Sequence, residues 1–153
     1  MTLPQLALHL HLRAVTPEEL ADLQDDYTEL VDFMLDAWED HEEETEDGIA
    51  TSLCRNSHRI ARMYGPGDGE LPVYGGRSYP DPEDVDPPVL VLDPTEVRRA
   101  AAFLSAFPID ELTAQRRELG LDEEDDLDTH EDLLDFYLDA ADSGDAVIKA
   151  FWL

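Results

Sequence analysis

The sequence predicts an α+β fold in which a small mixed or antiparallel sheet is covered by about four to five helices. Three apolar segments with the pattern of strands lie near the start, at the centre and at the end of the chain, and helical patterns fill the sequence between them. Two of these helices begin with a clear capping signal. A chain of 153 residues has the usual size of one domain, so we expect residues 1–153 to share a single core.

The first strand is expected over residues 6–15, where leucines at every second position alternate with Ala7, His9, His11 and Arg13. The next residues, Thr16 to Glu19, combine an N-cap, a proline at the first helical position and a glutamate three residues after the cap. The helix that begins there keeps its apolar spacing to about His41 and could be broken near Asp25-Asp26. Residues 42–48 lose the apolar stripe and are predicted to be a loop or a frayed helix end.

A second helix is predicted for Ile49–Tyr64, with apolar residues on one face and the basic residues on the other. Residues 65–88 are rich in Gly, Pro and Asp and are expected to be a long irregular connection within the domain. The C-terminal half then predicts a buried strand, three helices and a final strand. Their expected positions are Val89–Leu92, a helix capped by Asp93, a helix from Pro108 to Glu118 with Gly120 as its stop, a helix capped by Thr129 and ended by Gly144, and residues 146–153.

The charge balance is extreme, with 38 Asp and Glu against 10 Lys and Arg and a formal net charge of −28. No Lys or Arg occurs between Ala14 and Cys54. Such a chain repels nucleic acid and anionic membranes, so neither is expected as a partner. Three interpretations remain open: general solvation, including adaptation to salt; a surface matched to a basic partner; and cation binding. Neither Glu39 to Asp47 nor Asp122 to Glu131 places a glycine at the sixth position of a calcium loop, which argues against cation binding.

Two groups of residues are candidate sites. The acidic, partner-binding group consists of Asp22, Asp25, Asp26, Glu29, Asp32, Asp36, Glu39 and Asp40. The anion-binding group consists of Arg55, His58, Arg59 and Arg62 on one helical stripe, which could instead form internal ion pairs. His9 and His11 could face one metal ion, but no third ligand is identifiable and a solvent-facing or helix-covered strand face is the simpler interpretation. No metal, cofactor or catalytic residue is assigned.

Several segments resemble a known family. They are TPEEL, VYGGR, VLVLDPTEVRRAAAFLSAFPIDEL and DLLDFYLDAADSGDAVIKAFWL, and together they resemble the YfbM-like family of bacterial proteins, a domain of unknown function (DUF1877). The resemblance implies an α+β fold and carries over no catalytic residue. Family members tend to begin with a Met-Gly-Met segment, from which Thr2 to Leu8 departs.

The leading functional hypothesis is a non-enzymatic interaction protein, of the immunity or antitoxin kind, that presents its acidic helix to a basic partner. The alternative is a small-molecule binding domain or enzyme that uses the face from Arg55 to Arg62. No apolar run reaches the roughly 20 residues of a membrane span. The N-terminus lacks the pattern of a signal peptide, and Cys54 is the single cysteine, so we expect a cytoplasmic protein.

Overall fold

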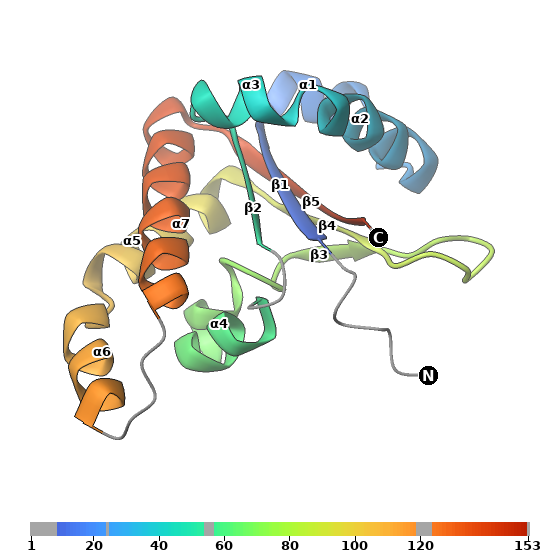
Figure 1. The fold of residues 1–153 in the computed structure, drawn as a ribbon. Helices are drawn as coiled ribbons and strands as arrows, with labels where there is room; N and C mark the ends of the chain where they lie inside the picture. Colours follow the sequence, from blue (N-terminus) through green and yellow to red (C-terminus); the bar gives the residue numbers. More distant parts are fainter. Residues whose placement is uncertain (1–8, 24, 54–56, 119–123, 153) are drawn as a thin grey trace.

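A computed structural model describes residues 9–23, 25–53, 57–118 and 124–152. Its sheet has five antiparallel strands in the order β2-β1-β5-β4-β3 (Figure 1). The strands are β1 (His9–Val15), β2 (Ala50–Leu53), β3 (Arg77–Tyr79), β4 (Val89–Leu92) and β5 (Ala146–Trp152). Together with the helices around the sheet, this confirms the predicted α+β class and makes the sheet purely antiparallel.

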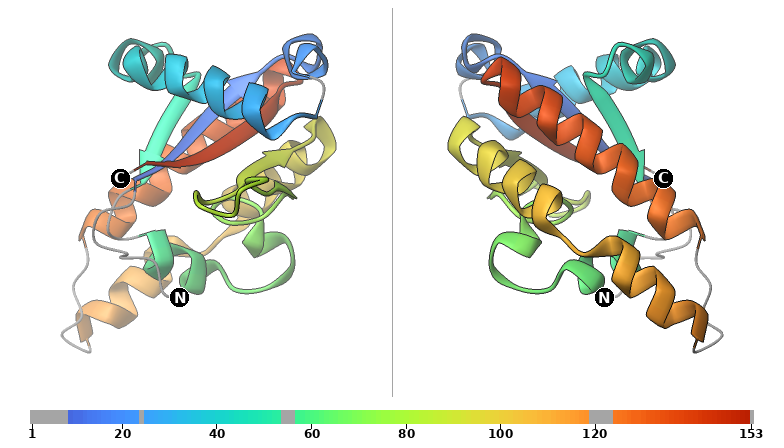
Figure 2. Two further views of the ribbon diagram at one scale, coloured as in Figure 1. Left: turned by 90° about the vertical axis from the view of Figure 1, so that its right-hand side faces the viewer. Right: turned by 90° about the vertical axis from the view of Figure 1, so that its left-hand side faces the viewer.

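One layer of helices lies on each face of the sheet. The first layer follows β1 and consists of α1 (Pro17–Asp22), α2 (Tyr27–Glu39) and α3 (His41–Glu46), which lie together above the sheet in Figure 1. The second contains α4 (Ser57–Tyr64), α5 (Pro94–Ala106), α6 (Ile109–Glu118) and α7 (Glu124–Ser143). Figure 2 shows α5 and α7 side by side, with α6 extending beyond them.

The sheet therefore separates two apolar cores. On one face, Leu12 of β1 and Val147 of β5 pack with residues of α4, α5 and α7, such as Tyr137. On the other face, Ile148 packs with Met34 of α2. The alternation predicted for β1 is correct, but neither face of the strand is open to solvent, because α2 and α3 cover the side that carries the histidines. Residues 6–8 of the predicted strand lie outside the described residues.

Both predicted capping signals are confirmed. Thr16 and Glu19 form a reciprocal capping box at α1, and Asp93 and Glu96 form one at α5. The expected break near Asp25-Asp26 separates α1 from α2, with Asp25 at a φ of 54°. The helix expected from Pro108 to Glu118 is α6, whose predicted stop, Gly120, lies outside the described residues. Gly144 ends α7 with a φ of 73°, where a glycine is favoured.

The prediction of one helix over Ile49–Tyr64 is wrong in its first half. Ala50–Leu53 is strand β2, which pairs with β1 from Leu10↔Leu53 to Arg13↔Ala50. The apolar spacing happened to fit a helix, but the backbone of Ala50–Leu53 completes the open edge of β1.

Three further segments differ from expectation. Residues 41–46 form helix α3 rather than a loop, because three glutamates in its first turn are stabilised by the positive N-terminal end of the helix dipole. The connection 65–88 holds a 3-10 turn, η2 (Gly67–Glu70), and the edge strand β3. Helix α7 begins at Glu124, before the predicted cap at Thr129. Several of its residues from Leu133 onward pack in the core, and this packing supports a helix that extends beyond the local signal. No helix in the described ranges is long and apolar enough to cross a membrane.

Candidate functional site

The eight acidic residues expected to bind a partner are all exposed on the layer formed by α1 and α2. Asp25 accepts a hydrogen bond from the Tyr79 hydroxyl at 3.0 Å, and Asp26 caps α2 by accepting from the backbone N–H of Thr28 at 3.0 Å. The other six form no hydrogen bond or ion pair with the part of the chain that the structure describes. These are Asp22, Glu29, Asp32, Asp36, Glu39 and Asp40. Their charge is therefore available to a partner.

A hollow opens on this layer at the joint between α2 and α3, with a volume of about 450 Å³. We call it the acidic hollow; it is lined by Trp38, Glu39, Asp40, His41, Glu42 and Glu43. The four carboxylates are exposed, whereas Trp38 and His41 are half-buried with their ring centroids 4.5 Å apart. Carboxylates beside an indole ring suit an ammonium or guanidinium group, which can pair with the acids and lie over the ring.

An exposed apolar side chain lies among the acids of α2. Leu35 is 47% exposed, and Asp32 and Glu39 are its neighbours on the helix surface. An apolar group inside a polar rim is the usual arrangement of a protein interface. A similar group lies on α7, where Leu138 is 44% exposed near Asp135 and Asp142.

His11 packs against Trp38 and His41 and is fully buried. Its ring centroid is 4.9 Å from that of each neighbour. The indole Nε1–H of Trp152 donates to His11 Nδ1 at 3.2 Å, so the neutral imidazole carries its proton on Nε2. Burial, with smaller contributions from His41 and Arg13, lowers the pKa of His11 to about 3. His11 is therefore a neutral packing residue.

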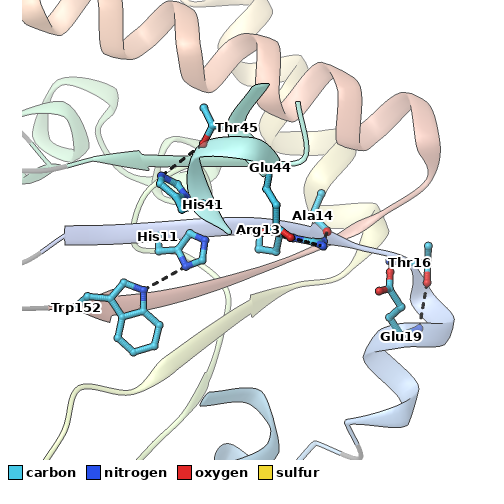
Figure 3. Close-up of polar contacts among 9 residues, drawn as sticks. All are labelled: His11, Arg13, Ala14, Thr16, Glu19, His41, Glu44, Thr45 and Trp152. Atoms are coloured by element: carbon cyan, nitrogen blue, oxygen red, sulfur yellow. Dashed lines mark hydrogen bonds and ion pairs between the residues drawn. The ribbon is translucent and has the colours of Figure 1, made fainter. Parts of the chain in front are cut away.

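The alternative of a metal site at His9 and His11 gains no support. Within the described ranges, no group of three or more His, Cys, Asp or Glu side chains could hold a metal ion. Arg13, the third member of this row, pairs with Glu44: Nη2 donates to Oε2 at 3.1 Å, and Nε lies 3.1 Å from Oε1. This ion pair ties β1 to α3 and holds the wall of the acidic hollow against the sheet (Figure 3).

The basic stripe is only partly assembled. His58 and Arg62 are exposed on α4, and Arg59 is half-buried. Arg55 lies outside the described residues, and the other three residues lie on α4. The structure therefore brings together part of the predicted anion-binding group.

With the geometry established, comparison with known families identifies the chain. The model of a domain of unknown function, DUF1877, matches residues 7–150. The chain belongs to the DUF1877 family. The resemblance seen in the sequence is thus confirmed for this family, and the match includes β1 to β4 and the part of β5 up to Ala150. Searches of curated proteins and of solved structures each gave no match.

Sequence reasoning missed several residues that shape this DUF1877 surface. Trp38 and His41 were assigned to the apolar stripe or the end of a long helix, and Glu42 and Glu43 to a loop. The bend at Asp40, the C-cap of α2 and N-cap of α3, places all four around one hollow. A tryptophan next to the acidic run Glu39 to Glu44, which only His41 interrupts, was the available signal.

Proposed function

We propose that this DUF1877 protein is an interaction protein that binds a basic protein partner on the surface of α1–α3. In this proposal a Lys or Arg side chain of the partner enters the acidic hollow. The observation that carries the proposal is the hollow itself, which is lined by four exposed carboxylates together with Trp38. An immunity protein or an antitoxin, which covers a basic toxin, would act in this way.

The uninterrupted charge of this layer supports the same proposal. Between Ala14 and Cys54 the chain has no Lys or Arg, so no cation on α1–α3 competes with a partner for the carboxylates. A field of one sign steers an oppositely charged protein toward the surface and raises its association rate at low salt. Leu35 supplies the apolar contact that charge alone does not provide.

The proposal predicts that neutralising the hollow abolishes specific binding. The hollow variant carries Glu39→Gln, Asp40→Asn, Glu42→Gln and Glu43→Gln. Its matched control carries Glu131→Gln, Asp135→Asn, Asp139→Asn and Asp142→Asn on α7, and both variants lose four negative charges. Affinity capture from lysate over a series of salt concentrations compares these two proteins with the wild type. The captured partner should bind the wild type and the control at least about ten-fold more tightly than the hollow variant.

Two outcomes would count against this proposal. Equal capture by all three proteins would show that only general charge attracts the bound material, as expected for acidity that serves solvation. Failure of the wild type to retain any basic protein at low ionic strength, where attraction is least screened, would remove the proposal altogether.

A further inference from the structure

A second hollow lies on the opposite side of the sheet from the acidic layer. It has a volume of about 580 Å³ and is formed between α4 and the segment Gly65 to Gly76. We call it the α4 hollow. The residues on which the inference depends are His58 and Arg62 of α4, Glu70 of η2, and Tyr74, Gly75 and Gly76 of the following segment.

Among the residues that the structure describes, no carboxylate pairs with the charge of Arg62, although the chain has 38 carboxylates. Arg62 is exposed and makes no hydrogen bond or ion pair with any residue in the described ranges. By contrast, Arg13 pairs with Glu44 and Arg99 pairs with Asp68. A guanidinium group that lines a hollow and has no ion-pair partner there can donate two parallel N–H groups to a ligand.

The opposite wall of the α4 hollow is fixed from beneath by Lys149. This side chain of β5 is fully buried, and its ammonium group donates to the carbonyl oxygens of Leu71, Val73 and Gly75, the last two at 3.0 Å. The hydroxyl of buried Tyr137 donates to the carbonyl of Pro72 at 2.8 Å. Lys149 and Tyr137 thus bind four carbonyl groups between Leu71 and Gly75. These buried hydrogen bonds make the wall rigid before any ligand binds.

Tyr74 supplies an aromatic surface on that wall. Its ring stacks on Phe151 with 6.2 Å between centroids, and its hydroxyl shares a 2.8 Å hydrogen bond with Ser57 Oγ. The His58 ring lies 5.2 Å from the Tyr74 ring. Burial raises the pKa of Tyr74, so its phenol stays neutral and can contact an apolar ring.

The charges around the α4 hollow favour a ligand with a single negative charge. Arg62 lines this hollow and attracts an anion. However, Glu70 also lines the hollow, and the whole chain carries a net charge of −28, so a second negative charge on the ligand would be repelled. A carboxylate therefore fits better than a phosphate dianion.

We propose that the α4 hollow binds a small aromatic carboxylate, with Arg62 pairing to the carboxylate and the Tyr74 ring contacting the aromatic ring. This site lies apart from the acidic hollow and does not depend on the proposed partner. The anion site expected from the sequence had four side chains on one helix. The site proposed here uses one of them, Arg62, together with the Tyr74 ring of the rigid wall.

Benzoate is the probe that tests this proposal. It is titrated into the full-length ¹⁵N-labelled protein while amide signals are followed by NMR. Benzoate should bind at millimolar concentration and shift signals of α4 and of residues 70–76. Benzamide, which is neutral, and phenyl phosphate at pH 8, which is a dianion, should each bind at least about ten-fold more weakly.

Arg62→Ala should weaken benzoate binding about ten-fold to a hundred-fold, the usual loss for a hydrogen-bonded charge. This variant should fold normally because Arg62 is exposed and contacts no described residue through its charge. Arg98→Ala, which removes an exposed arginine of α5, is the matched control and should bind benzoate like the wild type. The hollow variant of α2 and α3 should also bind benzoate normally.

The proposal is wrong if benzoate does not bind, if benzamide binds equally well, or if Arg62→Ala binds like the wild type. It is also wrong if the shifted signals belong to α1–α3. None of these results bears on partner binding, so the two proposals can fail separately.

Discussion

Lys149 is the single lysine of the chain, and its charge lies in the middle of the sheet between Leu12 of β1 and Leu90 of β4. Burial lowers the pKa of this ammonium group well below its usual value. The three carbonyl groups that surround it match its three N–H donors. Because all the donors of this buried group are used, the residues that it binds are held in one arrangement.

Replacing Lys149 with methionine should therefore destabilise the protein. The change leaves three carbonyl groups without their donor, and we expect a loss of about 3 kcal/mol in the free energy of unfolding. Urea denaturation followed by circular dichroism measures it. Leu90→Met changes a cross-strand neighbour at nearly constant volume and should cost less than about 1.5 kcal/mol. Equal free energies of unfolding for Lys149→Met and the wild type would show that the three carbonyl groups accept hydrogen bonds from water instead.

The sequence gives no warning of this role for Lys149. Lys149 lies two residues from Val147 and two from Phe151, on the same face of β5. The strand pattern therefore places it on the core side, where a lysine is rarely found. Its partners are 74 to 78 residues away in the sequence. Contacts at such a separation depend on the whole fold and cannot be derived from local pattern.

At the scale of elements, the caps determine where two helices begin. Asp93 accepts from the backbone N–H of Glu96 at 2.8 Å, and Glu96 accepts in return from the N–H of Asp93 at 3.1 Å. Asp93→Ala should lower the free energy of unfolding by about 1 kcal/mol. Asp86→Ala, an exposed acid of the preceding loop, should change it by less than about 0.5 kcal/mol. Thermal unfolding of both variants tests the difference, and equal losses would mean that α5 does not need its cap.

The elements that could be predicted are those with local signals. Both capping boxes, the buried strand β4 and the final strand β5 follow from neighbouring residues. β2 and β3 could not be predicted in this way, because each is short and is defined by its pairing with β1 or β4. The acidic surface was visible in composition, whereas the two hollows arise from bends and from segments brought together by the fold.

At the scale of the whole molecule, three histidines connect stability to pH. Burial lowers the pKa of His11, His41 and His130, so the folded protein binds their protons less readily than the unfolded chain does. The unfolded chain takes up these protons below about pH 6.5. The free energy of unfolding should therefore fall as the pH drops below 6.5, by up to about 1.4 kcal/mol per pH unit for each histidine.

The range between about pH 6.5 and 5 isolates this effect, because ordinary carboxylates remain ionised there. In urea denaturation across this range, the free energy of unfolding of His11→Phe should fall less steeply with decreasing pH than that of the wild type. His58→Gln, which changes an exposed histidine, should keep the wild-type slope. The explanation fails if His11→Phe and the wild type lose stability in parallel.

The strand order has a consequence for the synthesis of this chain on the ribosome. β5 is the central strand, and it joins the pair β1 and β2 to the pair β3 and β4. It is also made after all the other strands. Two-stranded pairs are marginally stable by themselves. A nascent chain that stops before residue 146 therefore leaves the inner edges of β1 and β4 open, and the sheet closes only when the last of its strands has left the exit tunnel.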